Sequence, residues 1–309
     1  MTGIIVGCLG LCILVFFMPQ STSHAQSNLT FDVGGSRIEV IVNGDSLPLS
    51  QDELGHWVRN AAESVTAYYG HFPTPNPVIQ IGTFAGAGVR DGRTFQSGGG
   101  LIRLRVGTRT TANDLASDWM LTHEMVHLAF PSVPDQHHWI EEGIATYVEP
   151  IARIQAGHLD AASMWRDLVR DMPQGLPAAG DQGLDKTHTW GRTYWGGALF
   201  CFLADIEIRR ETKNSKGLQD ALRGILDAGG DMRRDWELEK ALQIGDRTTG
   251  THVLTNLYMQ MRDKPAGANL DELWKQLGVS VEGGVAHFRE DAELSAIRRS
   301  IVATMPVSH

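Results

Sequence analysis

The sequence predicts an α+β protein, with a mixed β-sheet in the first third of the chain and helices through most of the rest. One observation is that 38–42 alternates apolar and polar side chains, while 78–81 and 101–106 are short β-rich runs beside proline and glycine clusters. Another is that apolar side chains recur at helical spacing beyond residue 139. We detect no internal repeat, so the order of elements favours one folded unit of two lobes.

The N-terminal elements are expected from local signals. A helix should begin at Ser50, a favoured N-cap residue, and run to about Tyr69. Three closely spaced prolines then precede the strand at 78–81. The glycine-rich stretch 82–100 is interpreted as a mobile loop over a cleft. The run 101–106 is therefore expected to be the strand beside a bound substrate.

The C-terminal half is expected to be helical. An amphipathic helix around 139–151 should be disturbed at Pro150, which lacks a backbone N–H. Glycine and threonine clusters separate the later candidates. These candidates are 190–210, 215–226, 235–242, 252–261 and 270–277, the last of them capped by Asn269. A loop and a short helix are expected to complete the chain.

The stretch 121–127, Leu-Thr-His-Glu-Met-Val-His, carries the strongest chemical signal. On an α-helix, His123 and His127 project from one side with an offset of roughly 40°, so both imidazoles can reach one Zn²⁺. Glu124 is rotated by about 100° from its neighbour and can face water at the metal. The alternative is that both histidines are ordinary core side chains bonded to backbone carbonyls. The glutamate between them favours the metal site.

The helix that carries this motif is expected to be long and buried. Thr111 followed by Asp114 resembles the capping pattern of a helix start. Apolar residues recur from there to Ala129, and Pro131 and Pro134 end the pattern. Such a helix would run along the floor of a cleft.

A catalytic zinc usually takes three protein ligands and leaves a fourth position open. Glu142 is the predicted third ligand, because Gly143 after it removes bulk where two helices cross. Glu141 would point about 100° away and is expected to contact solvent or a ligand residue instead of the metal. The rival ligands lie in the connecting segment, at Asp135, His137 and His138.

Together these motifs resemble the gluzincin metallopeptidases. His-Glu-x-x-His followed by Trp-x-x-Glu-Gly-x-Ala is similar to the pattern of the aminopeptidase N and glycyl aminopeptidase families, and the likeness covers residues 70–230. It implies a zincin-like catalytic domain of two lobes in which Glu142 is the third zinc ligand. The segment 193–200 resembles the family segment whose tyrosine, here Tyr194, stabilises the oxyanion of the tetrahedral intermediate. His188 is the alternative donor.

One departure from the family concerns the anchor for the substrate's amino terminus. Aminopeptidases of this kind carry a glycine-rich strand segment before the zinc helix, and a glutamate in it binds the free amino group. The corresponding stretch 96–105 has the glycines and the strand but no glutamate. Its backbone is still expected to align a peptide by strand pairing. The choice between endopeptidase and exopeptidase action therefore stays open.

The predicted function is hydrolysis of peptide bonds in peptide or protein substrates, with Zn²⁺ as the cofactor. Glu124 would take the proton of a zinc-bound water as it attacks the carbonyl, while the metal and Tyr194 stabilise the developing charge. Two alternatives stay open: an exported zinc-containing binding protein without turnover, and a zinc amidase acting on cell-wall peptides. We expect 26–135 to form the α+β lobe and 136–309 the helical lobe.

The N-terminal segment predicts export. Residues 4–18 are uninterruptedly apolar, and 23–25 (Ser-His-Ala) offers a small-any-small cleavage signal. Because the run is shorter than the ~20 residues of a bilayer span, 1–25 is interpreted as a signal peptide. An uncleaved anchor is the alternative, since 1–3 carries no Lys or Arg. Cleavage would leave Cys201 alone and without a disulfide partner, which suits a bacterial periplasm.

The balance of charge argues against nucleic acid as a partner. The chain has 27 Lys and Arg against 36 Asp and Glu, a formal net charge of −9, and its basic residues are scattered. Contact with a membrane is expected only if the N-terminal segment is uncleaved. Nothing in the pattern indicates an oligomeric state.

Overall fold

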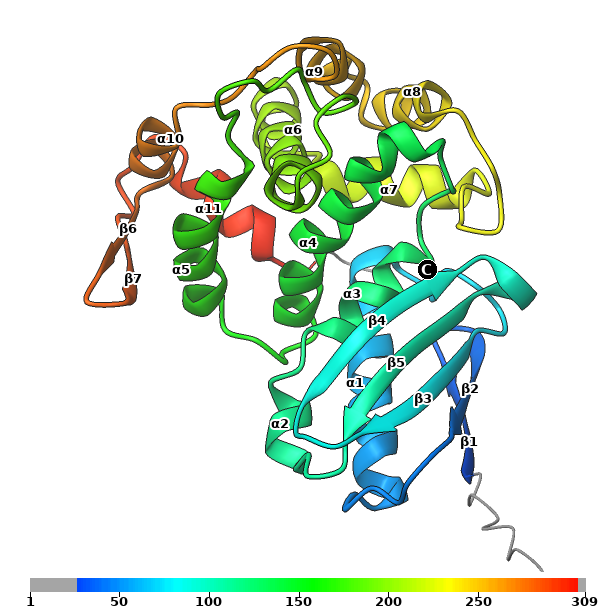
Figure 1. The fold of residues 1–309 in the computed structure, drawn as a ribbon. Helices are drawn as coiled ribbons and strands as arrows, with labels where there is room; N and C mark the ends of the chain where they lie inside the picture. The colour runs from blue at the N-terminus through cyan, green and yellow to red at the C-terminus, as the bar shows by residue number, and fades with distance from the viewer. Residues whose placement is uncertain (1–26, 305–309) are drawn as a thin grey trace, which may run out of the picture.

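The computed structural model describes residues 27–304 and contains a five-stranded sheet, a two-stranded hairpin and a large helical part. The strand order of the large sheet is β1 (Ser27–Val33), β2 (Ser36–Val42), β3 (Val78–Phe84), β5 (Leu101–Gly107) and β4 (Val89–Phe95). β2, β3 and β5 are parallel, whereas β1 and β4 are antiparallel edge strands. The sheet lies at one end of the molecule and most helices at the other (Figure 1). The predicted α+β class is confirmed.

Helix α1 (Gln51–Tyr69) lies beside the sheet and joins it to the helical part. Ser50 is its N-cap, as predicted, and forms a reciprocal capping box with Glu53. Gly70 ends the helix with a φ of 89°, a left-handed conformation that glycine adopts without steric cost. α1 contacts β1 and also the two helices α3 (Met120–His127) and α4 (His138–Gln155), so it forms part of the core between sheet and helices.

The helical part is built around α4 and α6 (Gly197–Glu211), which pack against each other (Figure 1). The other helices are α2 (Ala112–Ala116), α5 (Ala161–Asp171), α7 (Leu218–Asp227), α8 (Leu238–Thr249), α9 (Val253–Met261), α10 (Leu270–Leu277) and α11 (Ser295–Val302). The hairpin strands are β6 (Val279–Glu282) and β7 (Val285–Phe288). The side chain of Asn269 caps α10 as predicted, by accepting from the Glu272 N–H.

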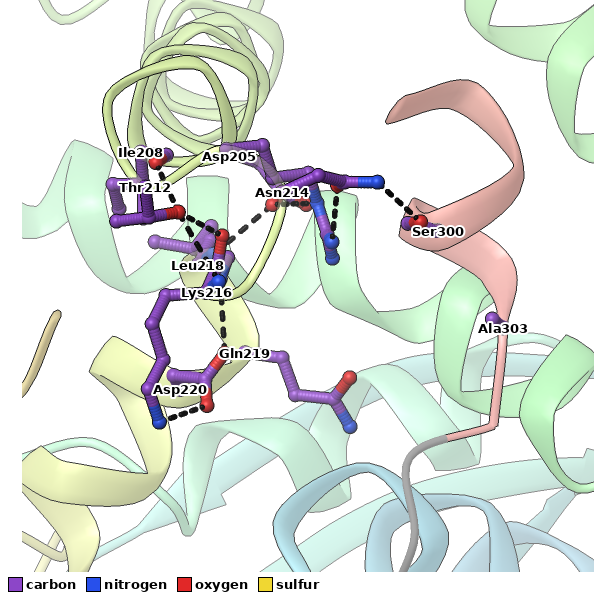
Figure 2. Close-up of polar contacts among 12 residues, drawn as sticks. Asp205, Ile208, Thr212, Asn214, Lys216, Leu218, Gln219, Asp220, Ser300 and Ala303 are labelled. Carbon is purple, nitrogen blue, oxygen red and sulfur yellow. Dashed lines mark hydrogen bonds and ion pairs between the residues drawn. The ribbon is translucent and has the colours of Figure 1, made fainter. Parts of the chain in front are cut away.

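Buried polar contacts hold the turn between α6 and α7 (Figure 2). Asp205 accepts hydrogen bonds from Arg209 Nε at 2.8 Å and from the Leu218 backbone N–H at 3.0 Å. Asn214 donates to Ser300 Oγ at 2.8 Å and so ties the turn to α11. Because these buried groups are paired, the turn avoids the cost of unsatisfied polar atoms and fixes α6 firmly.

The segment 82–100 is not the loop that we predicted. It contains β4, which forms an edge of the sheet, so β5 lies between β3 and β4 and is not an edge strand. The pairing register of β4 shifts between Arg90 and Arg93, and Asp91 has a φ of 58°. Such a bulge interrupts the alternation by which a strand is recognised in a sequence.

One prediction about the helices was wrong. The capping box of Thr111 and Asp114 is present, but it begins the short helix α2, and α3 starts separately at Met120. A capping pattern marks the start of a helix and says little about its length. α4 contains Pro150 and continues past it as far as Gln155, so the proline does not end the helix.

The predicted signal peptide or anchor at 1–25, with Cys8 and Cys12, lies outside the described residues. Between residues 27 and 304 there is no helix of the length and apolarity needed to span a membrane. Cys201 is buried in α6. The division of the chain at residue 135 stays a prediction.

Candidate metal centre

Asp118 defines the start of α3 and hence the directions of its side chains. Its carboxylate accepts hydrogen bonds from the backbone N–H groups of Met120 and Leu121, each at 3.1 Å, and from Trp57 Nε1 at 3.0 Å. These bonds satisfy amides that the first turn of a helix leaves unpaired. The Trp57 contact also ties α3 to α1. Asp118 was not predicted from the sequence, although aspartate is a favoured residue at helix starts.

The three predicted metal ligands lie together. Nε2 of His123 is 3.1 Å from Oε2 of Glu142, and Nε2 of His127 is 3.6 Å from the same oxygen. One ligand atom from each residue lies within 4.8 Å of the other two. Two atoms bonded at about 2.0 Å to a tetrahedral zinc lie roughly 3.3 Å apart. The donor set therefore fits a zinc ion, and the two distances to Glu142 match this spacing.

Gly143 allows α4 and α6 to touch through their backbones. A Cβ on Gly143 would collide with the backbone of Gly197, and a Cβ on Gly197 would collide with the carbonyl oxygen of Trp139. Neither position can hold a side chain at this approach, which confirms the predicted reason for Gly143. The contact holds Glu142 beside the residues that lead into α6.

The Glu142 carboxylate keeps its negative charge although it is buried. Burial alone would raise its pKa, but hydrogen bonds with His123, His127 and His138 outweigh burial and hold the pKa of Glu142 well below its usual range. For His127, burial lowers the pKa but the Glu142 contact raises it, and the net pKa is raised. An ionised carboxylate is the form that binds a metal cation.

His138, one of the rival ligands, contacts the other oxygen of Glu142. His138 Nε2 lies 3.2 Å from Oε1 of Glu142, and His138 Nδ1 lies 3.1 Å from Oε2 of Glu141. Glu141 also accepts a hydrogen bond from the Val133 N–H at 3.3 Å. His138 and Glu141 therefore orient Glu142 from outside the ligand group, as partners of metal ligands commonly do.

The other two rival ligands lie outside the ligand group. His137 Nδ1 is 2.9 Å from Oδ1 of Asp185, which also accepts from Trp139 Nε1 at 2.8 Å. Asp135 is exposed on the short turn η2 (Asp135–His137). His137 thus anchors the start of α4, and neither residue belongs to the ligand group.

The carboxylate of Glu124 is held from β4. Thr94 Oγ1 lies 2.6 Å from Oε2 of Glu124 and 2.8 Å from the Glu124 backbone oxygen. The hydroxyl has one proton and donates it to one of these two oxygens at a time. Gly92 leaves room for the other oxygen, since a Cβ there would lie 2.6 Å from Oε1. Neither residue was predicted from the sequence, because both lie on a different element about 30 positions earlier in the chain.

Tyr194 faces the same cluster from a short π-helical turn, η4 (Arg192–Gly196). Its ring centroid lies 6.4 Å from that of His123, with an angle of 22° between the ring planes. Burial, followed by the negative charges of Glu142 and Glu124, raises the pKa of Tyr194 to about 12. The hydroxyl therefore stays protonated at neutral pH and can donate. His188, the alternative donor, is exposed and does not line the cleft.

The cluster lies in a cleft of about 910 Å³ between β4 and the helices α3 and α4. Residues 91–96 form one wall of this cleft. The edge strand that a peptide can join is therefore β4, and not the stretch 96–105 named in the sequence analysis. β4 carries Asp91 and Arg93 but no glutamate, so the departure from the aminopeptidase pattern persists on the correct strand.

Solved structures with this fold are described as an aminopeptidase N family protein and as M1 zinc metallopeptidases. One is an aminopeptidase N family protein from Idiomarina loihiensis, with a TM-score of 0.62 and 13% identity over 83% of this chain and 50% of that chain. Another is a mutant M1 zinc metallopeptidase from Deinococcus radiodurans, with a TM-score of 0.51 and 15% identity over 79% of this chain and 53% of that chain. This chain thus spans about half the length of both structures.

The resemblance seen in the motifs is confirmed at the level of the fold. This chain has the fold of M1-type zinc metallopeptidase structures and brings a His-His-Glu group together within it. A scan against models of protein families finds no match, and no curated protein is significantly similar in sequence. The roles of the individual site residues are therefore argued from their geometry.

Proposed function

We propose that this protein is a zinc-dependent peptidase that hydrolyses peptide bonds in the cleft beside β4. The observation that carries the proposal is the grouping of His123, His127 and Glu142, with Glu124 held next to them. The likeness to solved zinc metallopeptidases supports it. Zn²⁺ at these ligands would supply a Lewis acid that polarises a carbonyl oxygen and lowers the pKa of water.

The chain's own residues supply the proton transfers. Glu124 accepts a proton from the attacking water and passes it to the leaving amine. Thr94 limits rotation of that carboxylate through its hydroxyl. Tyr194 donates a hydrogen bond to the oxygen on which negative charge develops, and one such donor is worth roughly 3 kcal/mol of barrier.

The edge position of β4 supports a peptide as the substrate. An edge strand presents unpaired backbone N–H and C=O groups, with which an extended peptide forms hydrogen bonds as an added strand. Residues 91–96 of this edge line the same cleft as the metal ligands. Pairing of this kind would hold a peptide bond near Glu124 whatever the side chains of the substrate.

Metal analysis and digestion of a peptide library test the proposal. We expect bound zinc, and cleavage that a chelator abolishes and added zinc restores. Glu124→Gln should retain zinc and lower kcat by about 100-fold or more. The matched control is Glu293→Gln, which changes an exposed glutamate outside the cleft and should behave as wild type. Equal cleavage by the Glu124→Gln variant and the wild type would show that the base is misassigned.

The same digest separates the two alternatives. Bound zinc without cleavage of any library peptide would favour a binding protein without turnover. Cleavage restricted to cell-wall peptides would favour a zinc amidase, which shares the metal chemistry and differs in substrate.

Export is a further part of the proposal, and it rests on sequence alone. The apolar run at 4–18 and the small-residue signal at 23–25 support transport across an inner membrane into a periplasm. N-terminal sequencing of the protein from a periplasmic fraction should find Gln26 as the first residue. A mature protein that begins at Met1 and sediments with membranes would indicate an anchor instead.

A further inference from the structure

A second cavity, of about 640 Å³, adjoins the metal cleft. Trp119, His123 and Tyr194 line both spaces, so the two cavities adjoin at the candidate metal ligand His123. The walls of this second cavity come from the start of α3, the second half of α4, α5 and the η4 turn. None of its lining residues comes from β4, so it extends away from the strand edge. We name it the α5 chamber.

The α5 chamber has a mostly apolar surface, and its lining holds three arginines and three carboxylates. Its apolar lining includes Pro150, Leu159, Met164, Leu168 and Trp195. Every arginine in the lining has a carboxylate partner in the same lining. The pairs are Arg153–Glu149 at 2.9 Å, Arg166–Asp167 at 3.0 Å and Arg170–Asp167 at 2.9 Å. A charged group entering the chamber would lose hydration and find no free counter-ion among these side chains.

Two exposed tryptophans line the α5 chamber, and one of them, Trp119, also lines the metal cleft. Trp119 is 50% exposed and Trp190 is 60% exposed, although both are large and apolar. Trp119 packs edge-on against His123, with ring centroids 5.4 Å apart, and Trp190 stacks on Tyr194 at 5.6 Å. Exposed aromatic surface beside a cavity is typical of a binding site, because a ligand that covers it removes apolar area from water.

We infer that the α5 chamber binds a large apolar side chain, aromatic or long aliphatic, of the residue next to the cleaved bond. The inference rests on the proposed function, since His123 marks where the cleaved bond would lie. The volume falls within the roughly 300–1,000 Å³ of typical ligand pockets, so a phenylalanine or leucine side chain fits with room to spare. Pairing along β4 would be indifferent to sequence, and the chamber would supply the selectivity.

Peptides that differ at one residue beside the cleaved bond test this inference. We expect kcat/KM for phenylalanine or leucine to exceed that for glycine by about 10-fold or more, with lysine and glutamate no better than glycine. Trp190→Ala should reduce the phenylalanine-to-glycine ratio several-fold. Met259→Ala, which removes an equally exposed apolar side chain on α9, should leave this ratio unchanged. A preference for charged residues, or an unaltered ratio in Trp190→Ala, would overturn the inference.

A binding measurement separates failure of the α5 chamber from failure of the peptidase assignment. N-acetylphenylalaninamide and N-acetylglycinamide can be titrated against the protein by ligand-observed NMR, a readout that needs no turnover. We expect saturable binding of the phenylalanine probe and none of the glycine probe, with weaker binding to Trp190→Ala. That result would uphold the α5 chamber even if no peptide were cleaved. Equal behaviour of the two probes would refute it even in an active peptidase.

Discussion

Thr94 positions the side chain of Glu124 from the opposite wall of the cleft. Its hydroxyl lies 2.6 Å from the Glu124 carboxylate. Thr94→Val keeps the shape of the side chain and removes the hydrogen bond. We expect kcat to fall by about 10-fold, because the carboxylate gains rotational freedom, while zinc content stays unchanged.

Thr94→Ser is the matched control for this prediction, because it retains the hydroxyl and loses a methyl group. It should recover most of the wild-type kcat. If Thr94→Val turned over peptides as fast as wild type, Thr94 would have a merely structural role.

Tyr194 is expected to contribute through its hydroxyl alone. Tyr194→Phe should lower kcat by about 100-fold with little change in zinc content, since one donor to the developing oxyanion is lost. Steady-state kinetics with metal analysis would measure this. Tyr69→Phe provides a control, because the Tyr69 hydroxyl has no hydrogen-bond partner among the described residues. Similar losses in both variants would point to a general effect on packing.

The sequence could predict those site residues whose relation is local or marked by a motif. His123, Glu124 and His127 lie on one helix, where the spacing of residues determines the directions of their side chains. Glu142 precedes Gly143, and a glycine at this place indicates a close helix crossing. Thr94 could not be predicted in this way, because its contact depends on how β4 packs against α3. A side chain such as Thr94, which orients a site residue from another element, belongs to no periodic pattern or motif in the sequence.

The crossing of α4 and α6 should be the least tolerant contact between elements. Gly143→Ala would force the two backbones apart, and such overpacking typically costs about 1–3 kcal/mol. We expect a lower Tm together with weaker zinc binding, since Glu142 is the preceding residue. Gly55→Ala in α1 is the control, because its Cβ would meet only the edge of the Phe31 ring. A Gly143→Ala variant as stable as wild type would contradict this packing.

Elements with strong end signals were predictable, and bulged or short elements were not. The N-caps of α1 and α10 gave both starts correctly. β4 was missed because its bulge and glycine imitate a loop. α5 was also missed, although Asp160 caps it by accepting from the Ser163 N–H. That capping signal was present in the sequence and could have been used.

For the whole molecule, zinc should act as a cross-link between α3 and α4. The proposed ligands come from both helices, so binding would stabilise the folded state by about 4 kcal/mol at a zinc concentration 1,000 times the Kd. For a chain of this size we expect a chelator to lower Tm by roughly 10 °C. Differential scanning calorimetry would measure it, and His127→Ala should show almost no chelator effect. An equal shift in both proteins would place the stabilising metal elsewhere.

The α+β class was predictable for the whole molecule, but its internal arrangement was not. Strand order depends on which strands meet in space. Because β4 pairs with β5, the edge of the sheet is β4 and not β5. The α5 chamber likewise requires α3, α4, α5 and η4 to converge, and no local pattern in the sequence predicts that they do.

The backbone contact between Gly143 and Gly197 also limits the movement of α4 relative to α6. Glu142 directly precedes Gly143, and Tyr194 lies three residues before Gly197. Both side chains are therefore attached to segments that this contact holds together. Separating the two side chains would require α4 and α6 to move apart at this backbone contact. The spacing between Glu142 and Tyr194 should therefore stay fixed when a substrate binds.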